Sequence, residues 1–222
     1  MDERKWQILL DSLLPLLKAG VAFTVPLTLI SFALGLLLAI VTALARLSSW
    51  RVLQAVSKFY VWVIRGTPLL VQLFIIFYGL PSVGVTLDPF PAAVIGFTLS
   101  VGAYGSEIVR AAILSIHAGQ WEAAYSIGMT RFQALRRIIL PQASRVAVPP
   151  LANSFISLVK DTSLAATVTY TEMFRTAQQI TSTTYEPLLV YSEAAVIYLL
   201  FSTVLSGLQN HLEKRLDRFS AR

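Results

Sequence analysis

Two long runs without a charged residue constrain this chain more than any other feature. Residues 19–45 and residues 194–212 contain no Asp, Glu, Lys or Arg. A helix needs about 20 consecutive apolar residues to cross the hydrocarbon core of a bilayer. Only 14% of the whole chain is charged, whereas a soluble domain carries about a quarter charged residues. The sequence therefore predicts an all-α, polytopic membrane protein.

Apolar runs alternate with polar loops along the chain, and this alternation predicts five membrane spans. The predicted spans are residues 15–45, 54–80, 89–114, 146–171 and 187–212. The second is irregular because Arg-Gly-Thr-Pro at 65–68 lies within it, and a complete break there changes the count. Segment 172–186 is too polar to span and is expected to lie along the outer interface. Without repeats or linkers, residues 1–222 are predicted to form one transmembrane domain.

Positive charge gathers in alternate loops. Loop 46–58 carries three basic residues, and segment 110–145 carries five arginines against Glu122. The tail after residue 212 carries four basic residues against two acidic ones. Loops rich in Lys and Arg lie on the cytoplasmic side, so five spans place the N-terminus outside and the C-terminus in the cytoplasm. The net charge of +6 follows these loops, which indicates contact with membrane lipid and no nucleic-acid partner.

The residues needed for catalysis or metal binding are sparse. The chain has no cysteine, and His117 and His211 lie far apart without clustered carboxylates. No His-Glu-x-x-His or Gly-x-Ser-x-Gly motif is present. An intramembrane enzyme is therefore disfavoured, and neither a metal nor a cofactor is expected. A free-standing secondary transporter fits the charges within the spans, but it gives no reason for the polar insertion at residues 119–143.

That insertion encodes two short helices. Four residues of the first fall on one narrow face, at i, i+3, i+4 and i+7: Trp121, Ala124, Tyr125 and Gly128. Gly128 is expected to end this helix in the left-handed conformation. Thr130 opens a Thr-x-x-Gln capping box, which predicts a second helix that stops at Pro141. Such a unit is suited to dock a partner, or to lie on its own membrane with its arginines on anionic lipid.

The insertion resembles the EAA loop of ABC-importer permease subunits. The matching positions are Glu122, Ala123, Ala124, Gly128, Phe132, Ile138, Leu140 and Pro141. Met129 departs from the pattern, in which alanine is commoner there. Three other stretches resemble the polar amino acid branch of the family: residues 65–73, 103–124 and 158–168. The resemblance covers most of the chain and implies the type I ABC importer permease fold.

The resemblance also implies how such a chain works. In the family this loop is a coupling helix that sits in a cleft of a cytoplasmic ATPase subunit. The implied coupling residues are Glu122, Ala123, Ala124, Gly128 and Pro141. No glycine here is followed by Lys-Ser or Lys-Thr, so ATP must bind to another chain. The other implied partners are an extracytoplasmic solute-binding protein and a second permease copy or a homologue, in a bacterial inner membrane.

Charged residues within spans are costly and are candidates for substrate contact. Lys-Asp-Thr-Ser at 160–163 reads as an unwound joint before a new helix, with Asp161, Thr162 or Ser163 as its N-cap. A helix N-terminus at membrane depth can bind a substrate carboxylate, and Asp161 could bind an ammonium. The alternative is an ordinary cap at the outer end of the fourth span.

Four more residues are assigned to a substrate pathway, and three of them have an alternative. Glu107 has Arg110 three residues on, so a local ion pair is an equal possibility. Arg65 either extends to the cytoplasmic face or lines a cavity together with Gln72. Tyr104 contacts substrate or packs in the core or at the membrane interface. These mixed charges suit a zwitterion, and glutamine, cystine, arginine and histidine all remain open.

Overall fold

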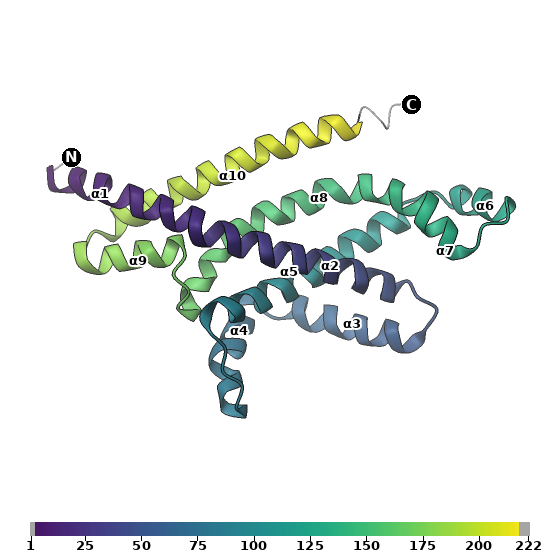
Figure 1. Cartoon of the computed structure of the whole chain (residues 1–222), viewed down its shortest axis with the longest axis horizontal. Helices are drawn as coiled ribbons and strands as arrows, with labels where there is room; N and C mark the ends of the chain where they lie inside the picture. Colours follow the sequence, from purple (N-terminus) through teal and green to yellow (C-terminus); the bar gives the residue numbers. More distant parts are fainter. Residues whose placement is uncertain (1–2, 218–222) are drawn as a thin grey trace.

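The computed structural model describes residues 3–217, and this part of the chain is built from helices without a strand (Figure 1). The α-helices are α1 (Glu3–Ala19), α2 (Val25–Arg46), α3 (Arg51–Gly66), α4 (Leu69–Phe74), α5 (Pro89–Leu114), α6 (Ala118–Ser126), α7 (Arg131–Ala134), α8 (Leu140–Asp161), α9 (Met173–Thr184) and α10 (Pro187–Asp217). The π-helical segments are η1 (Gly20–Thr24), η2 (Ile75–Gly79) and η4 (Leu135–Ile139), and the 3₁₀ segments are η3 (Leu80–Val83) and η5 (Thr162–Val168). Arg218 and Arg222, two basic residues of the predicted cytoplasmic tail, lie outside the described residues.

The long helices run along one direction, with α6 and α7 at one end and α9 at the other, and α4 projects from the side of the bundle (Figure 1). One end holds α6, α7 and the loop after α2, and the guanidinium of Arg131 donates to the carbonyl of Leu47 there at 3.2 Å. The other end holds α9 and the start of α1, where Arg4 donates to the carbonyl of Thr184 at 3.1 Å. The two loop regions predicted to be cytoplasmic therefore share one end, and α10 runs toward it (Figure 1).

Three of the described helices are long and apolar enough to cross a membrane by themselves: Glu3–Arg46, Pro89–Leu114 and Pro187–Lys214. The pair of α3 and the segment Leu69–Val83, which is bent by 104° at the predicted irregular break, makes a fourth when it is counted as one span. The predicted fourth span, 146–171, is occupied by α8 and η5. Helix α8 packs against α2, α5 and α10.

Each of three prolines is preceded by a π-helical turn. The residue before the proline donates to the carbonyl five residues back, in the pairs Val25 to Gly20, Leu80 to Ile75 and Leu140 to Leu135. Proline lacks an N–H and clashes with the carbonyl four residues back, and the wider turn removes that conflict. The prediction that a helix stops at Pro141 is therefore wrong, because the chain stays helical from Arg131 to Asp161.

Small residues bring α2 and α5, which share the most extensive interface of the fold, close together. A Cβ atom added at Gly35 would lie 2.5 Å from the Cβ of Val101, and one added at Gly102 would lie 2.7 Å from the Cδ2 of Leu38. Ala39 of α2 is fully buried against Gly105 of α5. Glycine here permits an approach that any larger residue would prevent.

Gly35→Ala is expected to destabilise the protein, because the added methyl group overlaps the Val101 side chain. Overpacking of this kind costs about 1–3 kcal/mol. Gly207→Ala is the matched control, since a Cβ at Gly207 meets no atom within 4 Å. Thermal unfolding in detergent should show a lower midpoint for Gly35→Ala alone. Equal midpoints for the two variants would contradict the close packing of α2 and α5.

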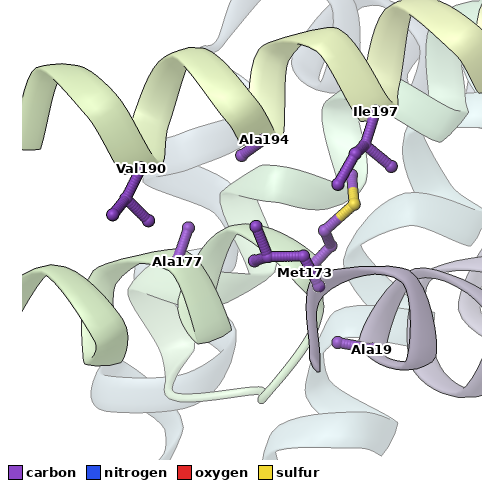
Figure 2. Close-up of a cluster of buried hydrophobic side chains, with 7 residues drawn as sticks. Ala19, Met173, Ala177, Val190, Ala194 and Ile197 are labelled. Atoms are coloured by element: carbon purple, nitrogen blue, oxygen red, sulfur yellow. The ribbon is translucent and has the colours of Figure 1, made fainter. Parts of the chain in front are cut away.

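Helix α9 is tied to α1 and α10 by buried apolar side chains. Figure 2 shows Met173 and Ala177 of α9 pointing toward Val190, Ala194 and Ile197 of α10, with Ala19 of α1 nearby. Met173 and Ala177 are fully buried. The helical spacing predicted for segment 172–186 is confirmed, and the segment packs onto the long helices through this apolar face.

Candidate functional site

The polar segment 119–143 folds as its local signals predict at Gly128 and at Thr130. Gly128 has φ +80°, its N–H donates to the carbonyl of Tyr125 at 2.9 Å, and the Met129 N–H donates to the carbonyl of Ala124 at 3.1 Å. These two bonds make a Schellman motif, which requires a left-handed residue such as glycine. The capping box is confirmed as well: Thr130 and Gln133 exchange hydrogen bonds at 2.9 and 3.3 Å.

The outer surface of α6 and α7 mixes polar and apolar side chains. Glu122, Ala123 and Gly128 are exposed, whereas Ala124 is only 3% exposed and packs beneath the segment. Two large apolar residues that the sequence analysis did not single out as a surface, Ile127 and Phe132, are about 70% exposed (72% and 69%).

Contacts on the inner side hold α6 in place over an apolar cavity. His117 caps α6 by accepting the Gly119 N–H at Nδ1 (3.1 Å), and Gln142 of α8 donates to Gln120 at 3.0 Å. The cavity has a volume of about 720 Å³ and lies between the segment and the ends of α2 and α5. Its lining residues include Leu44, Ile113, Trp121 and Leu135. The cap by His117 was not predicted, since histidine is not a usual N-cap residue.

A second cavity, of about 430 Å³, lies among α4, α5, α8 and η5. It brings together two predicted residues, Asp161 and Tyr104, although 57 positions separate them (161 minus 104). Asn153 and Ser157 line it too. These precede Asp161 by eight and four residues and so share its helix face, a spacing that the sequence shows. The cavity thus places one carboxylate beside an amide and a hydroxyl.

The turn after Asp161 differs from the prediction of a new helix N-terminus. The chain tightens from α8 into the 3₁₀ helix η5 without leaving helical geometry, and Asp161 makes no side-chain cap bond. Thr162 is fully buried, and its hydroxyl donates to the carbonyl of Val159 at 2.6 Å. The Ser163 hydroxyl donates to the carbonyl of Lys160 at 2.7 Å. The N-cap prediction for these three residues is therefore wrong, because the backbone N–H groups remain within the helix.

Glu107 is the centre of a cluster of arginines. Its carboxylate lies 2.6 Å from Arg46, 3.2 Å from Arg65 and 2.9 Å from Arg110. The pair with Arg110 was one of the predicted alternatives, whereas the pair with Arg46 joins residues far apart in sequence. The Arg65 guanidinium also lies over the ring of Tyr104, at 5.2 Å from its centroid.

Gln72 stabilises the bend between α3 and α4. Its Nε2 donates to the carbonyl of Ile64 at 2.8 Å and to the carbonyl and hydroxyl of Thr67 at 3.1 and 2.9 Å. These acceptors lie at the break before Pro68, where regular helical hydrogen bonds end. The structure thus places Gln72 at the break that orients Arg65.

Two further acidic residues, Glu172 and Glu193, accept hydrogen bonds from other helices. Glu172 is fully buried and caps α9, accepting the Arg175 N–H at 2.7 Å and the Tyr198 hydroxyl at 2.7 Å. Burial raises the pKa of this carboxyl. Glu193 accepts a hydrogen bond from the Ser12 hydroxyl. No group of three or more His, Asp or Glu residues within the described part of the chain is placed to hold a metal ion.

Comparison with known proteins gives this geometry a family context. Residues 35–218 match the family described as the inner membrane component of binding-protein-dependent transport systems. The chain is 56% identical over 218 residues to the L-cystine transport system permease protein TcyB of Bacillus subtilis, covering 98% of this chain and 93% of that protein. It is 37% identical to the glutamine transport system permease protein GlnP of Escherichia coli, with 91% and 94% covered.

A solved structure agrees over nearly the whole chain. It is described as an amino acid ABC transporter with histidines and superposes with a TM-score of 0.86 at 37% identity, covering 90% of this chain and 94% of that one. The inward-facing MetNI methionine ABC transporter superposes with a TM-score of 0.72 at 19% identity, which shows the shared fold alone. The predicted type I permease fold is thereby confirmed.

Proposed function

The chain belongs to the family of inner membrane components of binding-protein-dependent transport systems, as an ABC importer permease of the amino acid type, and we propose that L-cystine or a similar polar L-amino acid is its substrate. The observation that carries this proposal is the cavity around Asp161. A carboxylate within membrane helices is costly unless it has a partner, and the ammonium of an amino acid is such a partner. The 56% identity to a cystine permease favours cystine among the polar amino acids.

Each group of the cavity has a place in this proposal. Asp161 binds the ammonium group of the substrate. The Asn153 amide and the Ser157 hydroxyl donate hydrogen bonds to the carboxylate of the substrate. Tyr104 forms the wall toward Arg65 and Glu107, which continue the pathway beyond it. Thr162 and Ser163 hold the turn that carries Asp161, and Gln72 holds the break that carries Arg65, so they position the site.

The surface of α6 and α7 is proposed as the docking surface for a separate ATPase that binds ATP. Glu122, Ala123 and Gly128 form its polar part, and Ile127 and Phe132 add apolar contacts. Ala124 and Pro141 support this surface from within and from the start of α8. ATP-driven closure of two ATPase subunits would move α6 and α7, and α8 would transmit this movement to Asp161, because α8 begins beside η4 and ends at Asp161.

We infer the remaining partners as follows. A binding protein delivers substrate outside, which the family description supports. A second permease copy or a homologue completes the pathway. The end with α6 and α7 faces the cytoplasm, and the end with α9 and the N-terminus faces outward. The support is the excess of basic residues in loop 46–58 and in segment 110–145, which share the first end. Segment 119–143 is the coupling element of a single domain that needs no cofactor of its own.

The substrate assignment is tested by competition. Vesicles containing this permease, its ATPase and its binding protein should take up radiolabelled L-cystine, and excess unlabelled L-cystine should compete fully. Two analogues should compete poorly from outside: cystamine, which lacks the carboxylates, and dithiodipropionate, which lacks the ammonium groups. The reason is that the cavity recognises both the carboxylate and the ammonium. Strong competition by either analogue, or no uptake of L-cystine, would contradict the assignment.

A further inference from the structure

Beyond Tyr104 lies a third pocket, of about 420 Å³, which the proposed function places along the pathway without assigning it a ligand. Its lining residues are Arg46, Lys58, Val61, Trp62, Arg65, Gly66, Tyr104 and Glu107. The Asp161 cavity contacts residues 100–105 of α5, whereas this pocket contacts Tyr104 and Glu107. The pocket therefore follows the cavity along α5, on the side toward α6 and α7. Its volume lies within the usual range for small-molecule sites, roughly 300–1,000 Å³.

Positive charge in this pocket exceeds negative charge. Arg46, Lys58 and Arg65 line it together with one acid, Glu107, which also pairs with Arg110. The Arg46 Nε is buried without a hydrogen-bond partner. Lys58 forms no ion pair with any residue from 3 to 214. Uncompensated cations among membrane helices favour the binding of an anion.

Arg65 is placed to bind such an anion. It shares Oε1 of Glu107 with Arg46, at 3.2 Å against 2.6 Å, while Arg110 holds Oε2. Arg65 can therefore turn to another anion without leaving Glu107 unpaired. Its side chain is 43% exposed and lies over Tyr104, which also lines the Asp161 cavity. A guanidinium presents two parallel N–H groups, which match the two oxygens of a carboxylate.

We propose that this pocket is a second, inward-facing site, which binds the carboxylate of an amino acid on the cytoplasmic side of the Asp161 cavity and slows uptake when the amino acid accumulates inside. The proposal rests on the proposed function, since it needs amino acid to pass the cavity. Glu107 is occupied by arginines, so the pocket offers no free acid for an ammonium. A carboxylate without an ammonium group is therefore sufficient for binding here, unlike at Asp161.

The probe is dithiodipropionate enclosed in vesicles that contain the complete transporter. It should reduce the initial rate of L-cystine uptake several-fold. Lys58→Gln should raise the concentration needed for half inhibition about tenfold, because one charged contact to the carboxylate is lost. Arg51→Gln is the matched control: Arg51 is an exposed residue at the start of the same helix, outside the pocket, and its loss should leave inhibition unchanged.

Two inhibition results would overturn the proposal, and so would evidence for a lipid site. In the first, internal dithiodipropionate fails to inhibit uptake. In the second, it inhibits the Lys58→Gln variant and the unaltered protein equally. A lipid phosphate has the same chemistry, so vesicles with and without phosphatidylglycerol are compared. If Lys58→Gln removes a dependence of uptake on phosphatidylglycerol while inhibition stays the same, the pocket is a lipid site. Absence of L-cystine uptake in vesicles without the probe would instead contradict the proposed function itself.

Discussion

Gly128→Asp is expected to abolish ATP-driven uptake, while the protein still accumulates in the membrane. Gly128 has φ +80° between α6 and α7, and its N–H completes the motif that ends α6. A Cβ added there meets no atom within 4 Å, so the fold itself has room for a side chain. The aspartate instead puts a negative charge on the proposed docking surface for the ATPase, which already carries Glu122. Uptake and membrane abundance are measured on the same vesicles.

Gly128→Asn separates the effect of charge from the effect of the backbone. Asparagine and aspartate both tolerate the left-handed conformation better than other residues with side chains. The asparagine variant should therefore retain a substantial part of the uptake. Normal uptake by Gly128→Asp would show that this surface does not transmit movement. Equal loss in both variants would assign the effect to the backbone rather than to docking.

Asp161→Asn is expected to lower the uptake rate at low substrate concentration by about a hundredfold. The substitution removes the charged contact to the substrate ammonium, and a hundredfold change corresponds to about 2.8 kcal/mol. The asparagine has nearly the same shape, so the cavity among α4, α5 and α8 should persist. Initial rates of L-cystine uptake over a range of concentrations give the effect on KM and on the maximal rate.

Asp88→Asn is the control for this substitution. Asp88 is an exposed acid immediately before α5, and its side chain makes no cap bond there. Its loss should leave uptake unchanged. If Asp161→Asn also transports with an unchanged KM, the carboxylate does not bind the ammonium, and the substrate lies elsewhere.

Local signals in the sequence predicted the segment that carries α6 and α7. The glycine stop at Gly128 and the capping box at Thr130 involve only neighbouring residues, so their geometry can be read from the chain. The long apolar runs likewise predicted membrane helices. The structure extends the first of these back to Glu3, because Pro15 is accommodated within α1 and Pro26 follows a π-helical turn.

Other features depend on hydrogen-bond register and on distant contacts. Pro141 looked like a stop, yet the π-helical turn before it lets α7 continue into α8. Asp161 looked like a cap, yet packing keeps the following residues helical. The pair of Arg46 and Glu107 spans 61 positions, so no local pattern could reveal it. Asn153 and Ser157 show the spacing of one helix face, but that face becomes a cavity wall only when α5 lies opposite.

By the function proposed above, an amino acid passes through this chain only when a separate ATPase acts on α6 and α7. The direct test is uptake of L-cystine into vesicles that contain the permease, the ATPase and the binding protein, with ATP present or absent. A parallel preparation omits the ATPase. The account predicts accumulation against a gradient only with ATP and the ATPase together. Accumulation of the same size by the permease alone would contradict it.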